Sequence, residues 1–406
     1  MMADAGAQGA DGQDTLFDRL GVRRVINGVG PATRLGGLTL HPVVVEAMRE
    51  ATINPVRMDD LERCAGRELA RLLDADAAYV TSGAAAALTL ATAAIIAGAD
   101  SARMDQLPRI ADAPHRVIVL AAHRDPYDRA LEAAGAELVV VGYPHSTHIG
   151  EIERALDGDV AAVLYRPGRP GNHPTLAAIA RLAGSRGVSV LVDGALYAPP
   201  LENLRRWLDD GAALVALSGG KHFRGPQASG ILCGRADLVE LVALLHQDMD
   251  EREQTWGRDQ SIDTPPRHGI GRAMKVGREQ IAGLVAAVER YVAAPGADDA
   301  AGIRELVRLR ELLTEEGTPV IWSETSPLGV PVLELDLVGA GVDADAFANG
   351  LAMLETPVYL EESEVWRGAL LVHPMALAEG DAEKIATSVA RVIADLASST
   401  DVEDDA

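Results

Sequence analysis

The chain contains 406 residues, of which 37 are Lys or Arg and 60 are Asp or Glu, so its formal net charge is −23. A chain this acidic is repelled by phosphate backbones and by anionic membrane surfaces. We therefore expect neither nucleic acid nor a membrane as its partner, and its length allows more than one domain.

Few residues are available for disulfides or metal sites. Two cysteines, Cys64 and Cys233, are too few for a disulfide framework. His145 and His148 have a spacing compatible with a metal, but no further ligands cluster nearby, and we expect no metal. The first residues lack the pattern of a signal peptide, and the most apolar helical run, 84–97, is too short to span a bilayer. These features predict a cytoplasmic protein.

The predicted elements begin after residues 1–20, which we expect to form a flexible N-terminal arm. Helices are predicted at 42–51 and 59–73, and strands then alternate with helices. The predicted strands are 77–80, 117–120, 137–141, 160–165, 188–192, 212–217 and 230–233, and the helices between them are 84–97, 126–134, 149–156, 175–186 and 201–208. This alternation is typical of a doubly wound, mostly parallel α/β sheet. We assign residues 21–255 to this large domain, with 21–55 as an N-terminal segment near the active site.

The remaining residues predict a connection and a second domain. Residues 256–296 read as a linker with a long connecting helix over 270–292. Residues 297–397 predict a smaller α+β domain, with helices at 303–315 and 382–396 and strands near 320–322, 332–337 and 369–373. Residues 398–406 form an acidic tail.

Polar or reactive groups follow several of the predicted strands. They are Thr81-Ser82-Gly83, His123, Asp193 and Ser218 to Lys221. Ligands of open α/β sheets bind outside the carboxyl ends of the strands, so these groups predict one site. Gly28-x-Gly30 lacks the third glycine of a dinucleotide loop, which argues against a nicotinamide enzyme.

Lys221 is one of only three lysines, with Lys275 and Lys384. A lysine amine can lose its proton and attack a carbonyl, whereas arginine stays protonated. Gly219 and Gly220 precede Lys221 at the end of a predicted buried strand. A reactive lysine and an ordinary loop lysine both fit this stretch when it is taken alone.

Two other strand ends suggest complementary roles. Ser82, Gly83 and Ala84 open a helix, where free N–H groups can hold a phosphate, although an ordinary capped helix has the same pattern. Asp193 ends a buried strand and needs a partner, which could be a pyridinium nitrogen, a helix cap or an internal salt bridge.

Further candidates are less specific. His123 could stack on a planar cofactor or be a loop histidine. Arg34, Arg224 and Arg367 could each meet a substrate carboxylate or phosphate, or lie on the surface. A phosphate seat, a stacking ring, a carboxylate and a lysine, in this order, match pyridoxal 5′-phosphate (PLP).

The chain resembles the fold-type-I PLP enzymes. The motifs Ile26-Asn27-Gly28, Thr81-Ser82-Gly83-Ala84-Ala85-Ala86 and Ser218-Gly219-Gly220-Lys221-x-x-Arg224-Gly225-Pro226-Gln227 are similar to the group of selenocysteine synthase (L-seryl-tRNA(Sec) selenium transferase), and within it to the D-glucosaminate-6-phosphate ammonia-lyase-like branch. The resemblance implies a Schiff base at Lys221, a pyridinium partner at Asp193, a phosphate cup at Ser82 to Ala84, a ring contact from His123, and further cofactor contacts from Ser218 and Gln227. It also implies a homodimer or larger homo-oligomer.

In the expected reaction an amino acid displaces Lys221 from the cofactor, which frees the lysine amine. We favour α,β-elimination, of the ammonia-lyase or dehydratase type, or β-replacement, with Lys221 as the base and Asp193 keeping the ring nitrogen protonated. The alternatives are a PLP-dependent aldolase, aminotransferase or racemase. A non-catalytic PLP-binding regulatory or scaffold protein is the alternative of another class.

Overall fold

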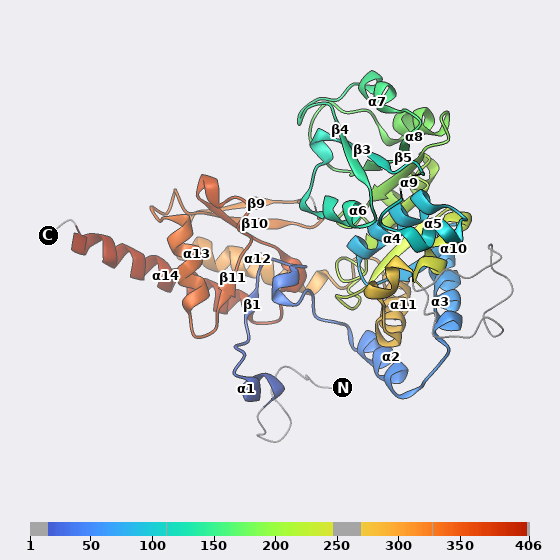
Figure 1. Ribbon diagram of the computed structural model, residues 1–406. Coiled ribbons are helices and arrows are strands. Elements are labelled where there is room, and N and C mark those ends of the chain that lie inside the picture. Colours follow the sequence, from blue (N-terminus) through green and yellow to red (C-terminus); the bar gives the residue numbers. More distant parts are fainter. Residues whose placement is uncertain (1–14, 111, 247–268, 327, 404–406) are drawn as a thin grey trace. The chain divides into compact units, whose positions relative to one another are not determined.

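The structure is a computed structural model that describes residues 15–110, 112–246, 269–326 and 328–403. The chain divides into two compact units (Figure 1). The larger unit is Leu38–Pro295, and the smaller one combines Met1–Gly37 with Gly296–Ala406. Parts of the predicted arm (1–14), linker (256–268) and tail (404–406) lie outside the described residues.

The larger unit is built on a seven-stranded sheet with the order β2-β8-β7-β6-β5-β3-β4. Its strands are β2 (Ala77–Thr81), β3 (Arg116–Leu120), β4 (Glu137–Val141), β5 (Val160–Tyr165), β6 (Ser189–Asp193), β7 (Leu214–Ser218) and β8 (Gly230–Gly234). Only β8 runs antiparallel to its neighbours in this sheet, pairing with β2 and β7. The predicted mostly parallel α/β sheet is therefore confirmed.

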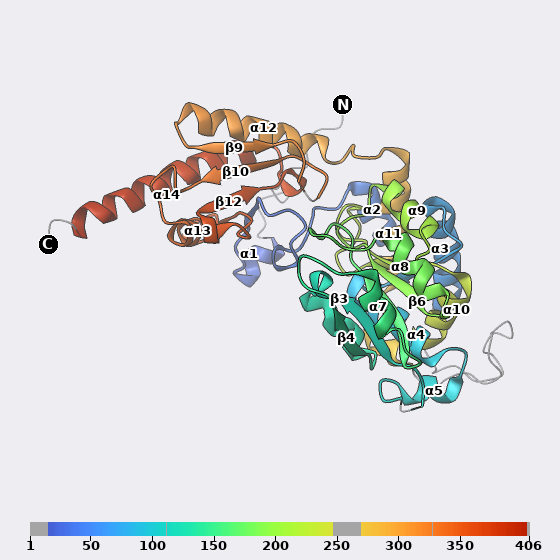
Figure 2. The same cartoon turned by 90° about the horizontal axis from the view of Figure 1, so that it is seen from above.

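Helices cover both faces of this sheet (Figure 2). One face carries α3 (Met58–Leu73), α7 (Ile149–Ala155), α8 (Leu176–Gly184), α9 (Leu201–Asp209) and α11 (Arg278–Ala293). The other carries α4 (Ala84–Ala97), α5 (Ser101–Gln106), α6 (Arg129–Ala133) and α10 (Ala236–His246). Fully burying a Val or Leu side chain stabilises the fold by about 1.5–3 kcal/mol, and the central strands bury many of them.

Helix α4 packs directly against one face of the sheet and is buried on nearly all sides. Its sequence is mostly alanine, so the helix can approach the strands closely, and its contacts reach β5, β6, β7 and β8. The predicted bounds of this helix agree with the structure. Because α4 is fixed by this packing, its N-terminus has a fixed place beside the sheet.

Two helical predictions for this unit need correction. The segment 126–134 consists of a 3-10 turn, Pro126–Asp128, followed by α6. The expected helix over 270–292 is a 3-10 helix, Ile270–Met274, and then α11, because Lys275 is extended and Gly277 caps a new helix. The apolar periodicity continues across this break, so it does not reveal the interruption. Helices α5 and α10 were not predicted.

The smaller unit contains an antiparallel sheet with the order β12-β10-β9 and a short parallel pair, β1 with β11. Its strands are β1 (Ile26–Asn27), β9 (Val320–Ser323), β10 (Val332–Asp336), β11 (Val358–Tyr359) and β12 (Ala369–Val372). Its longer helices are α12 (Ala300–Glu315), α13 (Ala344–Met353) and α14 (Asp381–Glu403). Neither α13 nor β11 was predicted, and α14 continues past the predicted helix end at residue 396.

The N-terminal residues pack differently from the expectation. Residues 21–37 were assigned to the large domain, but β1 pairs with β11 of the smaller unit. The buried Ile26 side chain and the hydrogen bond from the His373 amide to the Gly28 carbonyl hold this segment. The helices α1 (Leu16–Leu20) and α2 (Pro42–Ile53) flank it in sequence, and α2 packs on α11 in the larger unit.

Within the described residues, no helix combines the length and the apolar character needed to cross a membrane.

Candidate active site

The predicted site residues of the larger unit gather at one edge of its sheet. Strand β8 runs between β2 and β7, and its first residue, Gly230, pairs with Thr81 on one side and with Ser218 on the other. Gly230 therefore lies between the residue that precedes the start of α4 and the residue that precedes the Lys221 loop. The parallel strands β5 and β6 add their carboxyl ends to the same edge.

The start of α4 has the properties of an anion seat. Gly83 precedes the helix with φ 148° and ψ 167°, and no side chain caps the helix. A Cβ atom placed on Gly83 would meet nothing within 4 Å, and Ser82, Gly83 and Ala84 are half-buried. The first turn of α4 carries no acidic residue. The amide groups and the positive end of the helix dipole are thus available to a phosphate.

Gly230 keeps this seat in place, and the sequence analysis did not single it out. A Cβ atom on Gly230 would lie 2.5 Å from the carbonyl carbon of Gly83 and 2.8 Å from the amide nitrogen of Ala84. Only glycine lets β8 approach the start of α4 so closely. The available signal was an isolated glycine at the start of a strand, which often marks a close backbone approach.

Lys221 lies in a tight loop after β7. The amide of Gly219 donates to the Ser229 carbonyl at 3.0 Å, and a Cβ atom on Gly220 would lie 2.7 Å from Cα of Gln227. The two glycines before Lys221 therefore allow the loop to fold back on itself. Burial lowers the pKa of Lys221, while the carboxylates of Asp193 and Asp125 oppose this shift. A lysine with a lowered pKa is suited to act as a nucleophile.

Asp193 ends β6 and is paired with an arginine that the sequence analysis missed. Arg166 directly follows β5, and its Nε donates to Oδ2 of Asp193 at 2.9 Å. Its Nη1 donates to Oδ1 of Asp128 at 2.6 Å and to the carbonyl of His123. The side chains of Arg166 and Asp128 are 4% and 5% exposed, so this is a buried ion-pair network. One of the readings kept open for Asp193, an internal salt bridge, is present.

His123 is buried beneath this network rather than placed in a solvated loop. Its Nδ1 accepts a hydrogen bond from the Arg166 amide at 3.2 Å, and its ring meets Tyr165 edge-on at 4.9 Å between centroids. Burial, together with the positive charge of His173, Arg166 and Arg169, lowers the pKa of His123 to about 4. The ring is therefore neutral at pH 7. Its contact with a cofactor ring stays a prediction.

The three candidate arginines have different surroundings. Arg224 belongs to the Lys221 loop and has a left-handed backbone, with φ 53°. Arg34 and Arg367 belong to the smaller unit. Arg367 donates to both carboxylate oxygens of Glu334 at 2.7 Å and to Glu364 at 2.7 Å, and these carboxylates raise its pKa. Arg34 pairs with Glu362 at 2.9 Å. The charge of Arg367 is thus matched by two carboxylates.

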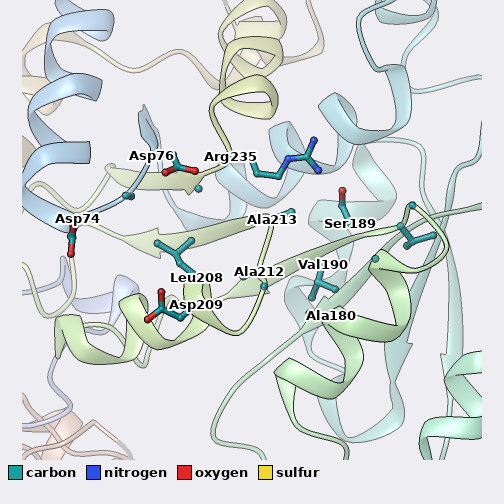
Figure 3. A pocket seen from close by; sticks show the side chains of 16 residues that line it. Asp74, Asp76, Ala180, Ser189, Val190, Leu208, Asp209, Ala212, Ala213 and Arg235 are labelled. Atoms are coloured by element: carbon teal, nitrogen blue, oxygen red, sulfur yellow. The ribbon is translucent and has the colours of Figure 1, made fainter.

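A separate cavity of about 550 Å³ lies at the amino ends of β6 and β7 (Figure 3). It is lined by Ser189, Asp209, Ala212 and Arg235, among others, and by none of the predicted site residues. No group of three His, Cys, Asp or Glu side chains suited to a metal occurs within the described ranges.

The residues at the carboxyl edge fit PLP. The group needs an amine for its aldehyde, an anion seat for its phosphate and a carboxylate for its ring nitrogen. The structure offers Lys221 with a lowered pKa, the uncapped start of α4, and Asp193.

Comparisons with known proteins agree with this fit, although no family model matches the chain. The chain is 30% identical to 5′-C-glycyluridine monooxygenase-decarboxylase of Streptomyces sp over 93% of this chain and 92% of that protein. It is 27% identical to D-glucosaminate-6-phosphate ammonia lyase of Salmonella typhimurium over 90% of this chain and 94% of that protein. A solved structure of D-glucosaminate-6-phosphate ammonia-lyase matches with a TM-score of 0.79 and 25% identity, covering 95% and 99% of the two chains.

L-seryl-tRNA(Sec) selenium transferase of Edwardsiella ictaluri is 27% identical over 66% of this chain and 57% of its own length. Fold, site and relatives together define the class: the chain is a PLP-dependent enzyme of fold type I, a lyase or a transferase. Within this class it belongs to the family that includes 5′-C-glycyluridine monooxygenase-decarboxylase and D-glucosaminate-6-phosphate ammonia lyase. The reading as a non-catalytic binding protein is therefore set aside.

Proposed function

We propose that this enzyme catalyses α,β-elimination on a β-hydroxy-α-amino acid. The hydroxyl group leaves the β-carbon, and hydrolysis of the resulting enamine gives one 2-keto acid and one ammonia per substrate. Atoms balance, because the water that leaves in the first step returns in the second. The observation that carries the proposal is the position of Lys221, a half-buried lysine of lowered pKa, at the carboxyl ends of the strands where Asp193 also lies.

The names of the relatives support this substrate class. D-glucosaminate is a 2-amino acid with a hydroxyl group on the next carbon. In 5′-C-glycyluridine the glycyl group is attached to C5′, the carbon that bears the 5′-hydroxyl of uridine. A serine residue has the same arrangement. The three names share an amino-bearing carbon beside a hydroxyl-bearing carbon, and we extend this feature to the present enzyme.

The residues are assigned the following roles. The amide groups at Ser82, Gly83 and Ala84 bind the phosphate, and Asp193 holds a proton on the ring nitrogen. Lys221 binds the cofactor and, once its amine is released by the substrate, Nζ removes the proton from Cα. When bound, PLP supplies an aldehyde that condenses with amines and a ring that accepts electrons from a bond at Cα. Ser218 and Gln227 complete the contacts to the cofactor, and the buried His123 supports Arg166.

A second candidate is oxidative decarboxylation. It is favoured by the name of the relative at 30% identity, a monooxygenase-decarboxylase. This reaction would consume O₂ and release CO₂ from the substrate carboxylate. Both reactions begin when the substrate amine releases Lys221, so the products decide between them.

The test uses the purified enzyme with PLP and a panel of L- and D-β-hydroxy-α-amino acids, including serine, threonine and D-glucosaminate. We expect ammonia and keto acid in equal amounts, without O₂ uptake. Lys221→Ala should abolish turnover, whereas Lys275→Ala, which removes a lysine from the same unit, should retain it. O₂ uptake with CO₂ release would favour the second candidate. Full activity of Lys221→Ala, or keto acid without ammonia, would refute the proposal.

A further inference from the structure

Four side chains of alternating charge form a chain that ends at Asp193. Arg124 pairs with Asp128, Asp128 with Arg166, and Arg166 with Asp193. The exposed fraction of the side chains falls from 48% at Arg124 to 5% at Asp128 and 4% at Arg166, and is 12% at Asp193. The chain of charges therefore runs from a partly solvated arginine to the buried end of β6.

Arg166 fixes the orientation of the Asp193 carboxylate. Its Nε holds Oδ2 at 2.9 Å, and the Ala195 amide lies 3.3 Å from Oδ1. The two contacts use different oxygens, so rotation of the carboxylate would break one of them. The guanidinium of Arg166 also donates to Asp128 and to the His123 carbonyl, while the Arg166 backbone amide donates to Nδ1 of His123. A guanidinium held by three acceptors in fixed positions is a rigid support.

Asp128 partly offsets the positive charge that Arg166 presents to Asp193. The three least exposed groups, Asp128, Arg166 and Asp193, carry a net charge of −1, and the fourth, Arg124, is the partly solvated end of the chain. Asp193 is therefore oriented by a cation, yet the three residues together keep the negative charge that a pyridinium requires. Removing Arg166 would leave the largely buried Asp193 carboxylate without its cation, whereas Asp128 would keep Arg124, and an unpaired buried charge is costly.

We infer that Arg166 is a positioning residue for Asp193 and sets the preference of the site for a cofactor with a basic ring nitrogen. This inference rests on the proposed contact between Asp193 and the ring nitrogen of PLP. It assigns a role to a residue that need not touch the cofactor itself. It also gives Asp128 a reason to be charged in a buried position.

The test compares two cofactors rather than two activities. PLP and 1-deazapyridoxal 5′-phosphate share aldehyde and phosphate, but the second has carbon in place of the ring nitrogen. The affinity of the apo-protein for each is measured by spectral titration. The preference, which is the ratio of the two dissociation constants, reports on the ring nitrogen alone. A general loss of structure would weaken the binding of both cofactors equally and leave the ratio of the two dissociation constants unchanged.

The wild type should prefer PLP, and Asp193→Asn should abolish this preference. Arg166→Met should reduce it by about 10-fold, within the range of coupling between contacting residues. Arg166→Lys keeps the positive charge but not the several fixed contacts, so its preference should lie between those of the wild type and Arg166→Met. If Arg166→Met does not fold, Arg166→Lys provides the test. Arg169→Met is the matched control, because Arg169 follows the same strand but pairs with Asp125, and should keep the wild-type ratio.

Two different results would contradict the proposed role of Arg166, and they have different consequences for the proposed function. If Asp193→Asn abolishes the preference while both Arg166 variants keep it, the inference is wrong and the proposed function stands. If Asp193→Asn leaves the preference unchanged, the proposed role of Asp193 is wrong, and the inference falls with it.

Discussion

Glu62 is a buried carboxyl group that the proposed mechanism does not use. It lies on α3, which packs against β2, and it is only 9% exposed. Neither of its oxygens makes a well-formed hydrogen bond to any of the described residues. Burial raises the pKa of Glu62 to about 8, opposed by the nearby Val80 amide. The folded protein thus binds the Glu62 proton more tightly than the unfolded chain, where a glutamate pKa is about 4.3.

This difference gives Glu62 a predicted pH signature. The stability that comes from the tightly bound Glu62 proton is fully present below the pKa of the unfolded chain. It is lost as pH rises towards the folded-state pKa of about 8. Each unit of pKa difference corresponds to about 1.4 kcal/mol. Glu62→Gln cannot ionise, so it should match the wild type near pH 4 and exceed it by more than about 1 kcal/mol at pH 8. Denaturant unfolding at several pH values measures this, and parallel curves for the two proteins would contradict it.

Individual site residues differ in how visible they are in the sequence. Lys221 and Asp193 could be proposed as site residues because each follows an apolar strand and is chemically unusual there. Arg166 follows a strand in the same way, but in a chain that uses arginine for nearly all its positive charge it carries no distinguishing mark. Its role depends on pairing with Asp128 and Asp193, which lie 38 and 27 residues away. Only the folded sheet brings these groups together.

At the level of elements, the proposed phosphate seat depends on how β8 meets the start of α4. Gly230 lies between β2 and β7 and leaves no room for a side chain beside Gly83 and Ala84. The chain direction of β8 is opposite to that of its neighbours, so its first residue, not its last, reaches the site. A small change at this residue would therefore move the seat without touching a cofactor ligand.

Gly230→Ala tests this dependence. The new methyl group should displace the Gly83–Ala84 backbone and weaken PLP binding by about 10-fold or more, because small misplacements of binding groups are costly. The affinity of the apo-protein for PLP is again measured by titration. Gly184→Ala is the control, since a Cβ atom there meets nothing within 4 Å, and it should bind PLP normally. Unchanged affinity in Gly230→Ala would show that the seat does not depend on this approach.

Most elements of the larger unit were predictable because their periodicity is strong. The strands of the sheet are short apolar runs between turns, and α4 is bounded by Gly83 and Gly98. The elements that were missed are short or lack a clear pattern: β11 has two residues, and α5 has six. The pairing of β1 with β11 joins segments more than 300 residues apart, which local patterns do not report.

At the level of the whole molecule, family membership extends over both units. The match to the Streptomyces relative covers 93% of the chain, which is more than either unit alone. The smaller unit is therefore part of the shared enzyme and not an added domain. The proposed cofactor residues all come from the larger unit, whereas two of the candidate substrate arginines come from the smaller one. The sequence indicated both units, but it did not indicate that residues before Gly37 belong with the C-terminal one.

The most direct test of the account is to find where PLP attaches. The enzyme with bound PLP is reduced with borohydride, which makes the imine bond permanent, and the modified peptide is identified by mass spectrometry. We predict that the label is on Lys221 alone and that Lys221→Ala carries none. A label on Lys275 or Lys384, or no label on a protein that binds PLP, would contradict the central claim.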